Sequence, residues 1–266
     1  MGLLIVSGPY YCDSRMKWCL SARVFLGLIV TPFIWFSTSQ AQQPAGHYEI
    51  SHDASGTQES HSRHTDSDWE GSAQGVAYSE FNHRFVGLFV LLFGLAELGH
   101  ALRYRMLLWP RLVLPSALGV IGTYLLIWSD HEAWPIGPLT FVQTFSGLDP
   151  EILQHKLYGV FSSITAVSEI FRRISWARHP GWAIPLLILG LGGAVLLFFH
   201  SHGHHPGSDT ITLHHTLLGS FGIGAAVSSG MVAWASGLSP ETAKRWELAW
   251  AGFVIVMGLQ LLLYYE

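Results

Sequence analysis

The chain has 266 residues, of which 50% are hydrophobic and only 12% charged, whereas an ordinary soluble domain has about 25% charged residues. Its 28 Gly and 11 Trp are typical of membrane spans and their interfaces, so the composition predicts membrane lipid, not nucleic acid, as the main partner. The two cysteines, Cys12 and Cys19, fall in a segment that we expect to be removed. The mature chain would then lack the thiols needed for disulfides, thiolate zinc sites or iron–sulfur ligation.

Residues 1–41 have the features of a signal peptide. Lys17 and Arg23 precede an apolar run, 24–36, which is followed by the small-x-small sequence Ser39-Gln40-Ala41. We expect cleavage there, with Met16 as an alternative start, and an uncleaved membrane anchor as the alternative interpretation. Residues 42–80 are polar, acidic and contain histidines. Because they show no apolar periodicity, they predict a disordered extracytoplasmic arm.

Residues 81–266 are predicted to form an all-α polytopic membrane domain. Each apolar stretch approaches the roughly 20 residues that a helix needs to cross the hydrocarbon core. The six predicted spans are 82–102, 108–128, 152–171, 182–200, 212–236 and 247–265. We expect these spans to form a membrane helix bundle built as three helix-hairpin repeats.

The basic residues between the spans predict the topology. They follow the first, third and fifth spans, and include Arg103, Arg105, Arg111, Arg172, Arg173, Arg178, Lys244 and Arg245. Cytoplasmic loops are enriched in Lys and Arg, so both mature termini are predicted to be extracytoplasmic in a multi-pass protein of a bacterial-type inner membrane. A signal peptide predicts the same topology independently.

An H-x3-G-x-F motif recurs at the start of the first, third and fifth predicted spans. It begins at His83, His155 and His215, and the first two copies are followed fourteen residues later by Glu97 and Glu169. At 100° per residue, each His and its Glu share one helix face, about 21 Å apart. Such a face should contact protein instead of lipid. The glycine one turn after each His should let neighbouring helices approach closely.

Three imidazoles at one depth predict a metal site at the outer face. Zinc or copper would suit such ligands, and the rings should then lie within about 5 Å of one another. The HSHGHHPG run that begins at His200 supports this interpretation, because short His-rich tracts often bind metal. The candidate ligands are His83, His155, His214, His215, His200, His202 and His205. The alternative is that each His caps its helix or bonds to an interfacial carbonyl.

Three further interpretations remain open. Glu97, Glu169 and His100 could form an ion or proton relay, whereas a di-iron centre would need a second E-x-x-H pair. A b-type cytochrome could hold haem between two helix histidines. An intramembrane zinc hydrolase could use Asp130 or Asp209 to activate water. The sequence does not decide whether the chain catalyses a reaction.

The same residues resemble the transmembrane protein 45 family. The H-x-x-x-G-x-F pattern from His83 through Gly94 and Leu95, the pair His155 and Glu169, and the later H-S-H-G run followed by His214 or His215 carry the resemblance. It covers most of residues 82–265 and implies a polytopic fold and a histidine site, but no reaction. A looser likeness to the copper-resistance D proteins rests on the outward placement of histidines alone, without the Met clusters or Cys that Cu(I) prefers.

Overall fold

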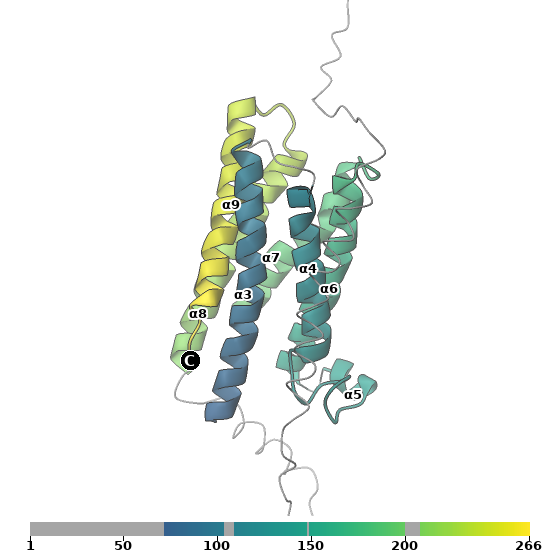
Figure 1. Ribbon diagram of the computed structural model, residues 1–266, viewed down its shortest axis with the longest axis vertical. Coiled ribbons are helices and arrows are strands. Elements are labelled where there is room, and N and C mark those ends of the chain that lie inside the picture. Colours follow the sequence, from purple (N-terminus) through teal and green to yellow (C-terminus); the bar gives the residue numbers. More distant parts are fainter. Residues whose placement is uncertain (1–71, 104–108, 148, 200–207) are drawn as a thin grey trace, which may run out of the picture. The chain divides into compact units, whose positions relative to one another are not determined.

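The computed structural model describes residues 72–103, 109–147, 149–199 and 208–266, and within them the regular secondary structure is entirely helical (Figure 1). The α-helices and the 3₁₀ helices (η) are, in chain order, α3 (Ala73–Ala101), η1 (Trp109–Leu112), α4 (Val113–Trp128), α5 (Phe141–Phe145), α6 (Pro150–Arg173), η2 (Pro180–Ala183), α7 (Ile184–Leu197), α8 (Ser208–Trp234) and α9 (Pro240–Leu262). The predicted all-α class is therefore confirmed for the described residues.

Five stretches of the described chain are long and apolar enough to cross a membrane. They are Ala73–Ala101, Pro110–Trp128, Pro180–Leu197, Asp209–Trp234 and Pro240–Leu262. These stretches correspond to five of the six predicted spans and have the character of a multi-pass integral membrane protein. The remaining helix, α6, covers the predicted third span but carries Glu151, Lys156 and Glu169, and it is not one of the five.

The prediction that the arm is disordered as far as Glu80 is wrong at its C-terminal end, because α3 begins at Ala73. The side chain of Ser72 caps this helix by accepting a hydrogen bond from the amide of Gly75, 3.0 Å away. Tyr78 then donates to the carbonyl of Trp128. These contacts with folded parts of the chain outweigh the polar composition. The predicted signal peptide and the rest of the arm lie outside the described residues.

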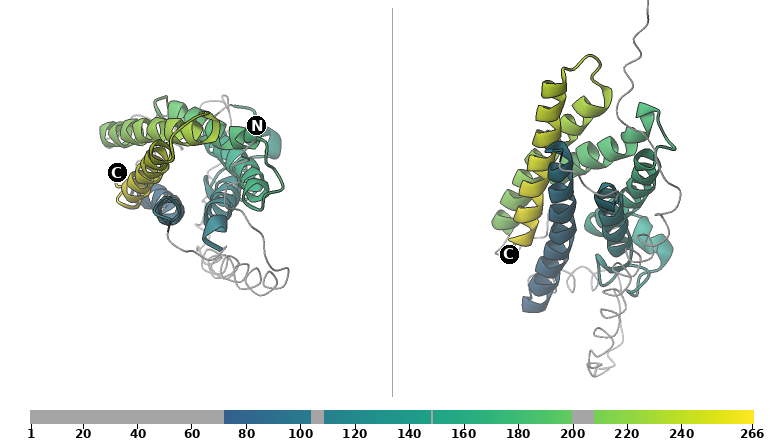
Figure 2. Two further views of the ribbon diagram at one scale, coloured as in Figure 1. Left: turned by 90° about the horizontal axis from the view of Figure 1, so that it is seen from above. Right: turned by 45° about the horizontal axis from the view of Figure 1, so that its top comes forward.

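The six long helices of the described chain form a closed ring. Each packs against two neighbours in the order α3, α9, α8, α7, α6 and α4, and α4 returns to α3. The end-on view in Figure 2 shows this arrangement around a central axis. Helix α3 begins at the end of the bundle where α9 finishes (Figure 1). We call this the histidine end, because His83, His155 and His215 all lie in the first half of their helices; the opposite end is the arginine end.

The glycines of the H-x3-G-x-F motif lie at close helix contacts, as predicted. A Cβ would come within 3.0 Å of a neighbouring backbone at each of them: at Gly87 against Leu262 of α9, at Gly159 against Leu126 of α4, and at Gly219 against Ala194 of α7. A larger side chain would force the helices apart. The motif therefore sets the spacing of the three pairs α3–α9, α6–α4 and α8–α7.

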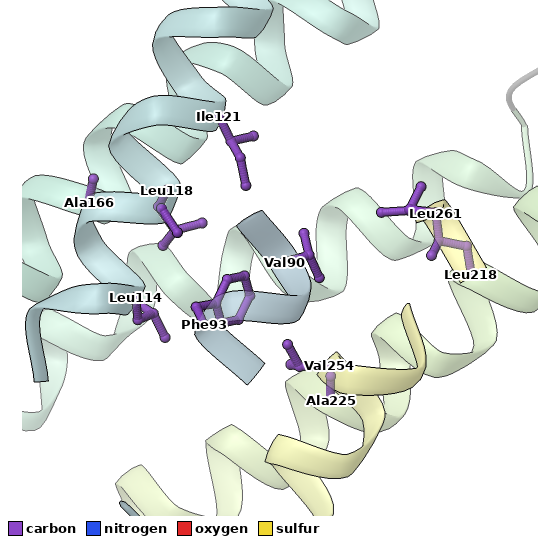
Figure 3. Close-up of a cluster of buried hydrophobic side chains, with 11 residues drawn as sticks. Val90, Phe93, Leu114, Leu118, Ile121, Ala166, Leu218, Ala225, Val254 and Leu261 are labelled. Carbon is purple, nitrogen blue, oxygen red and sulfur yellow. The ribbon is translucent and has the colours of Figure 1, made fainter. Parts of the chain in front are cut away.

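The hydrophobic core lies inside the ring. Figure 3 shows side chains from several helices of the ring turned toward one another; among them, Val90 and Phe93 of α3 are buried. The opposite face of the same helix carries Leu88, Leu92 and Leu95, which are 45–49% exposed. Large apolar side chains on the outside of a bundle are what contact with lipid requires, because lipid tails solvate them.

Candidate functional site

His83 and His215 are neighbours at the histidine end. Their ring centroids are 6.1 Å apart, and His83 stacks on Tyr264 with a centroid separation of 3.9 Å. The Nδ1 atom of His83 lies 2.9 Å from the carbonyl oxygen of Ser79. Because that oxygen can only accept, Nδ1 carries the proton, and a neutral ring then has its lone pair on Nε2.

His155 is oriented by a carboxylate. Its Nδ1 atom lies 3.1 Å from Oδ1 of Asp130, just after α4. The hydroxyl of Ser129 donates to the other oxygen of Asp130. Burial on its own would raise the pKa of Asp130, but the charge and hydrogen bond of His155 and the bond from Ser129 hold that pKa below its ordinary value. Asp130 is therefore an anion that fixes the orientation of the imidazole.

Tyr264 contacts both His83 and His214. The ring centroids of Tyr264 and His214 are 5.2 Å apart. Burial and the carboxylate of Glu266 raise the pKa of the Tyr264 hydroxyl, which donates to Glu266 Oε1 at 2.9 Å. The aromatic ring therefore stays a neutral phenol. It holds the end of α9 against the starts of α3 and α8.

The three motif histidines line one cavity of about 350 Å³ that is bounded by all six long helices. They do not form the predicted triad of rings. His83 and His215 are close, whereas His155 is held by Asp130. In the part of the chain that the structure describes, no three His, Cys, Asp or Glu side chains are grouped closely enough to hold a metal ion. His200, His202 and His205 lie outside the described residues.

Lys156, next to the motif histidine of α6, was not predicted to have a role. Its side chain is fully buried, and its Nζ atom donates to the carbonyls of Leu125 and Leu126 at 3.3 and 3.0 Å. These carbonyls belong to the last turn of α4, where the helix dipole favours a cation. Lys156 therefore satisfies the end of α4 from inside the bundle, close to the ion pair of Asp130 and His155.

Glu97 and Glu169 meet at the arginine end, inside the bundle. Arg173 bridges them: its Nη1 atom is 2.8 Å from Glu97 and its Nε atom 3.2 Å from Glu169. Arg172 also pairs with Glu169, and the indole of Trp250 donates to Glu97 at 3.4 Å. We call these five side chains the inner ion-pair cluster. Sequence reasoning found both carboxylates but missed Arg173, although its i,i+4 spacing from Glu169 was a usable signal.

The residues predicted for a relay or a hydrolase differ in their exposure. His100 is exposed, and the carboxylates of the inner ion-pair cluster bond to Arg and Trp side chains; the relay through His100 stays a prediction. Of the two acids considered for a hydrolase, Asp130 lines the cavity, whereas Asp209 is exposed in the first turn of α8.

Comparisons with known proteins give no assignment. No family model, no curated protein and no solved structure matches the chain.

Proposed function

We propose that the chain is a six-span inner-membrane protein that binds copper or zinc at its histidine end, with His83 and His215 as the central ligands. The observation that carries this proposal is the pairing of two imidazoles from different helices, 6.1 Å apart between ring centroids, in the lining of one cavity. One ring nitrogen of each must lie about 2.0–2.1 Å from a shared metal ion. The observed separation is of the order that such a bridge requires.

The partners of the histidines support metal binding. A metal-ligating His almost always donates its other ring N–H to a carbonyl or carboxylate, which fixes the tautomer and the ring orientation. His83 has the carbonyl of Ser79 in this role, and His155 has Asp130. The bond of His83 to the Ser79 carbonyl is also what the helix-capping alternative predicts, so the proximity of His83 and His215 carries the proposal.

The proposed site is completed when metal binds. Two imidazoles leave a zinc or copper shell short of ligands, since zinc prefers four-coordinate geometry. His155 lines the same cavity, and its Nε2 atom, the ring nitrogen not bonded to Asp130, is the third nitrogen that it can offer. The run that contains His200, His202 and His205 ends directly before Ser208, where α8 begins, and offers further ligands.

Burial supports α6 as the sixth span of this proposal. Lys156 and Glu169 are only 0% and 1% exposed, so these two charges of the helix face the bundle and not its surroundings. Ionisable residues within spans take this orientation, because exposing charge to hydrocarbon costs several kcal/mol. With α6 as a span, Arg172, Arg173 and the other basic loops are cytoplasmic, and the histidine end is extracytoplasmic. The proposal includes the resemblance to the transmembrane protein 45 family, which implies the same polytopic fold and a histidine site.

A b-type haem is the second candidate, because two histidines from different helices, His83 of α3 and His215 of α8, lie near each other and haem iron can take two such axial ligands. One experiment separates the candidates. The protein is purified in detergent without chelators, and its visible spectrum is recorded beside its elemental content. Copper or zinc without a Soret band is the expected result. A strong Soret band would replace the metal proposal with haem, and neither metal nor haem after loading would reject both.

A further inference from the structure

The cavity inside the helix ring is much larger than a metal site. Its volume is about 350 Å³, within the roughly 300–1,000 Å³ range of small-molecule pockets. It extends from His83 and His215 at the histidine end to Phe93 and Trp250 in the middle of the bundle. A metal ion at its mouth would leave most of this space unused.

The deep part of the cavity is apolar. Val90, Leu118, Ile121, Val254 and Met257 line it, and Figure 3 shows the first four of these among the side chains that face the middle of the bundle. At its far end the indole of Trp250 donates a hydrogen bond to Glu97. An apolar cavity is a poor site for water, which needs several polar partners. It suits a hydrocarbon chain.

The mouth of the cavity is acidic. The ionisable side chains that line it comprise five carboxylates and four histidines, without a Lys or Arg among them: Asp130, Glu132, Asp149, Glu151 and Glu266, with His83, His131, His155 and His215. His155 pairs with Asp130 at 3.1 Å and His131 lies 3.8 Å from Glu132, and the carboxylates still outnumber the histidines in this lining. A carboxylate or phosphate head would meet like charges there, whereas a cationic head would be attracted.

We propose that this cavity binds a cationic amphiphile, a long-chain amine, with its hydrocarbon chain against Val90 and Val254 and its ammonium group among Asp130, Glu151 and Glu266. This binding activity goes beyond the proposed metal site, because it uses the apolar space below the histidines. The bundle is then a receptor for a lipophilic amine taken from the membrane or from the outer solution.

The test is equilibrium binding of radiolabelled dodecylamine to the full chain in nanodiscs, with empty nanodiscs subtracting partition into lipid. Dodecanoate has the same chain with an anionic head and serves as the comparison ligand. Wild-type protein should bind one dodecylamine saturably and at least tenfold more tightly than dodecanoate. Equal binding of the two ligands, or binding no greater than that of empty nanodiscs, overturns the proposal.

Two matched variants test the position of the chain. Val90→Trp fills the cavity, whereas Leu92→Trp places the same side chain on the outer face of α3, where Leu92 is 45% exposed. Val90→Trp should weaken dodecylamine binding at least tenfold and Leu92→Trp should not. If Val90→Trp fails to fold, Ala225→Leu, which fills the same cavity from α8, replaces it. Equal binding by the filled and control variants contradicts the proposal.

Metal content measured on the same preparations separates this inference from the proposed function. Retained metal with no dodecylamine binding rejects the amphiphile alone. Dodecylamine binding without metal rejects the metal site alone.

Discussion

Arg173 of α6 reaches across the bundle to Glu97 of α3, with 2.8 Å between Nη1 and Oε1. The same guanidinium contacts Glu169 on its own helix and the carbonyl of Arg111 at 2.9 Å. Arg173 therefore bridges two carboxylates that are 11% and 1% exposed, and Arg172 supplies the second positive charge through its ion pair with Glu169. Ion pairs therefore connect α3 and α6 at the arginine end, whereas residues of the histidine end line the cavity.

Removing Arg173 should therefore be costly. Arg173→Leu leaves Glu97 and Glu169 buried without their shared partner, and breaking a buried ion pair in this way costs about 3–5 kcal/mol. The free energy of unfolding, measured by denaturant titration in detergent with circular dichroism, should fall by that amount. Arg178→Leu, which changes an exposed arginine beyond the end of α6, is the control. Equal stability of the two variants would mean that the inner ion-pair cluster does not stabilise the bundle.

Substitutions at two glycines of α9, Gly258 and Gly252, test the packing of α9 against α3. A Cβ at Gly258 would lie 2.5 Å from the amide nitrogen of Leu91 in α3, whereas at Gly252 nothing lies within 4 Å. Gly258→Val should lower the free energy of unfolding by about 1–3 kcal/mol or more, the usual cost of overpacking. Gly252→Val should change it little. A similar loss in both variants would contradict the close contact between α3 and α9.

The pH dependence of stability should report the pair of Asp130 and His155. The folded-state pKa of Asp130 is lowered, so its contribution is complete above the ordinary carboxyl pKa of about 3.9 and is lost as the pH falls through the folded value. Asp130→Asn should therefore lower the free energy of unfolding at pH 7 by about 1.5–3 kcal/mol. The difference from wild type should disappear in strong acid.

Asp209→Asn is the control for this pH series, because Asp209 is exposed. Its unfolding free energy at pH 7 should stay within about 1 kcal/mol of wild type, the usual limit for an exposed charge at a helix N-terminus. A loss for Asp130→Asn that is the same at pH 7 and in strong acid would argue against the ion pair.

Fusions to alkaline phosphatase test the topology. The asymmetry of Arg and Lys predicts activity for a fusion after Glu266 and none for a fusion after Arg178, since the enzyme folds only outside the cytoplasm. Immunoblots must show comparable amounts of both fusions. The reverse pattern of activity would place the histidine end in the cytoplasm.

Sequence patterns predicted the structural features that depend on the residues of a single helix. Apolar length identified the helices, and the H-x3-G-x-F repeat identified close contacts at Gly87, Gly159 and Gly219. These features depend on local periodicity, which a sequence displays directly. The capping box of α5, formed by Thr140 and Gln143, is a local pattern of the same kind, because Thr and Gln have the S/T-x-x-E/Q spacing.

Contacts between helices were less accessible from the sequence. The motif places its histidines at a similar depth in the bundle, and from this we predicted that His83 and His215 lie near each other. It could not show that the Asp130 carboxylate bonds to His155. The buried Lys156 was missed for the same reason, since its partners are carbonyls of another helix. Helix rotation decides such pairs, and a one-dimensional pattern does not specify rotation within a ring of six helices.

The central claim is that His83 and His215 bind metal at the histidine end. Zinc titration of the purified apoprotein against a competing chelator tests it most directly, with wild type compared with the double variant His83→Gln and His215→Gln. His100→Gln changes an exposed histidine near the arginine end and is the control. We predict at least about tenfold weaker zinc binding in the double variant and unchanged binding in the control. Loss of a residue that only hydrogen-bonds to a metal ligand already costs about 10–100-fold in affinity, and loss of the ligands themselves should cost no less. Wild-type affinity and stoichiometry in the double variant would contradict the claim.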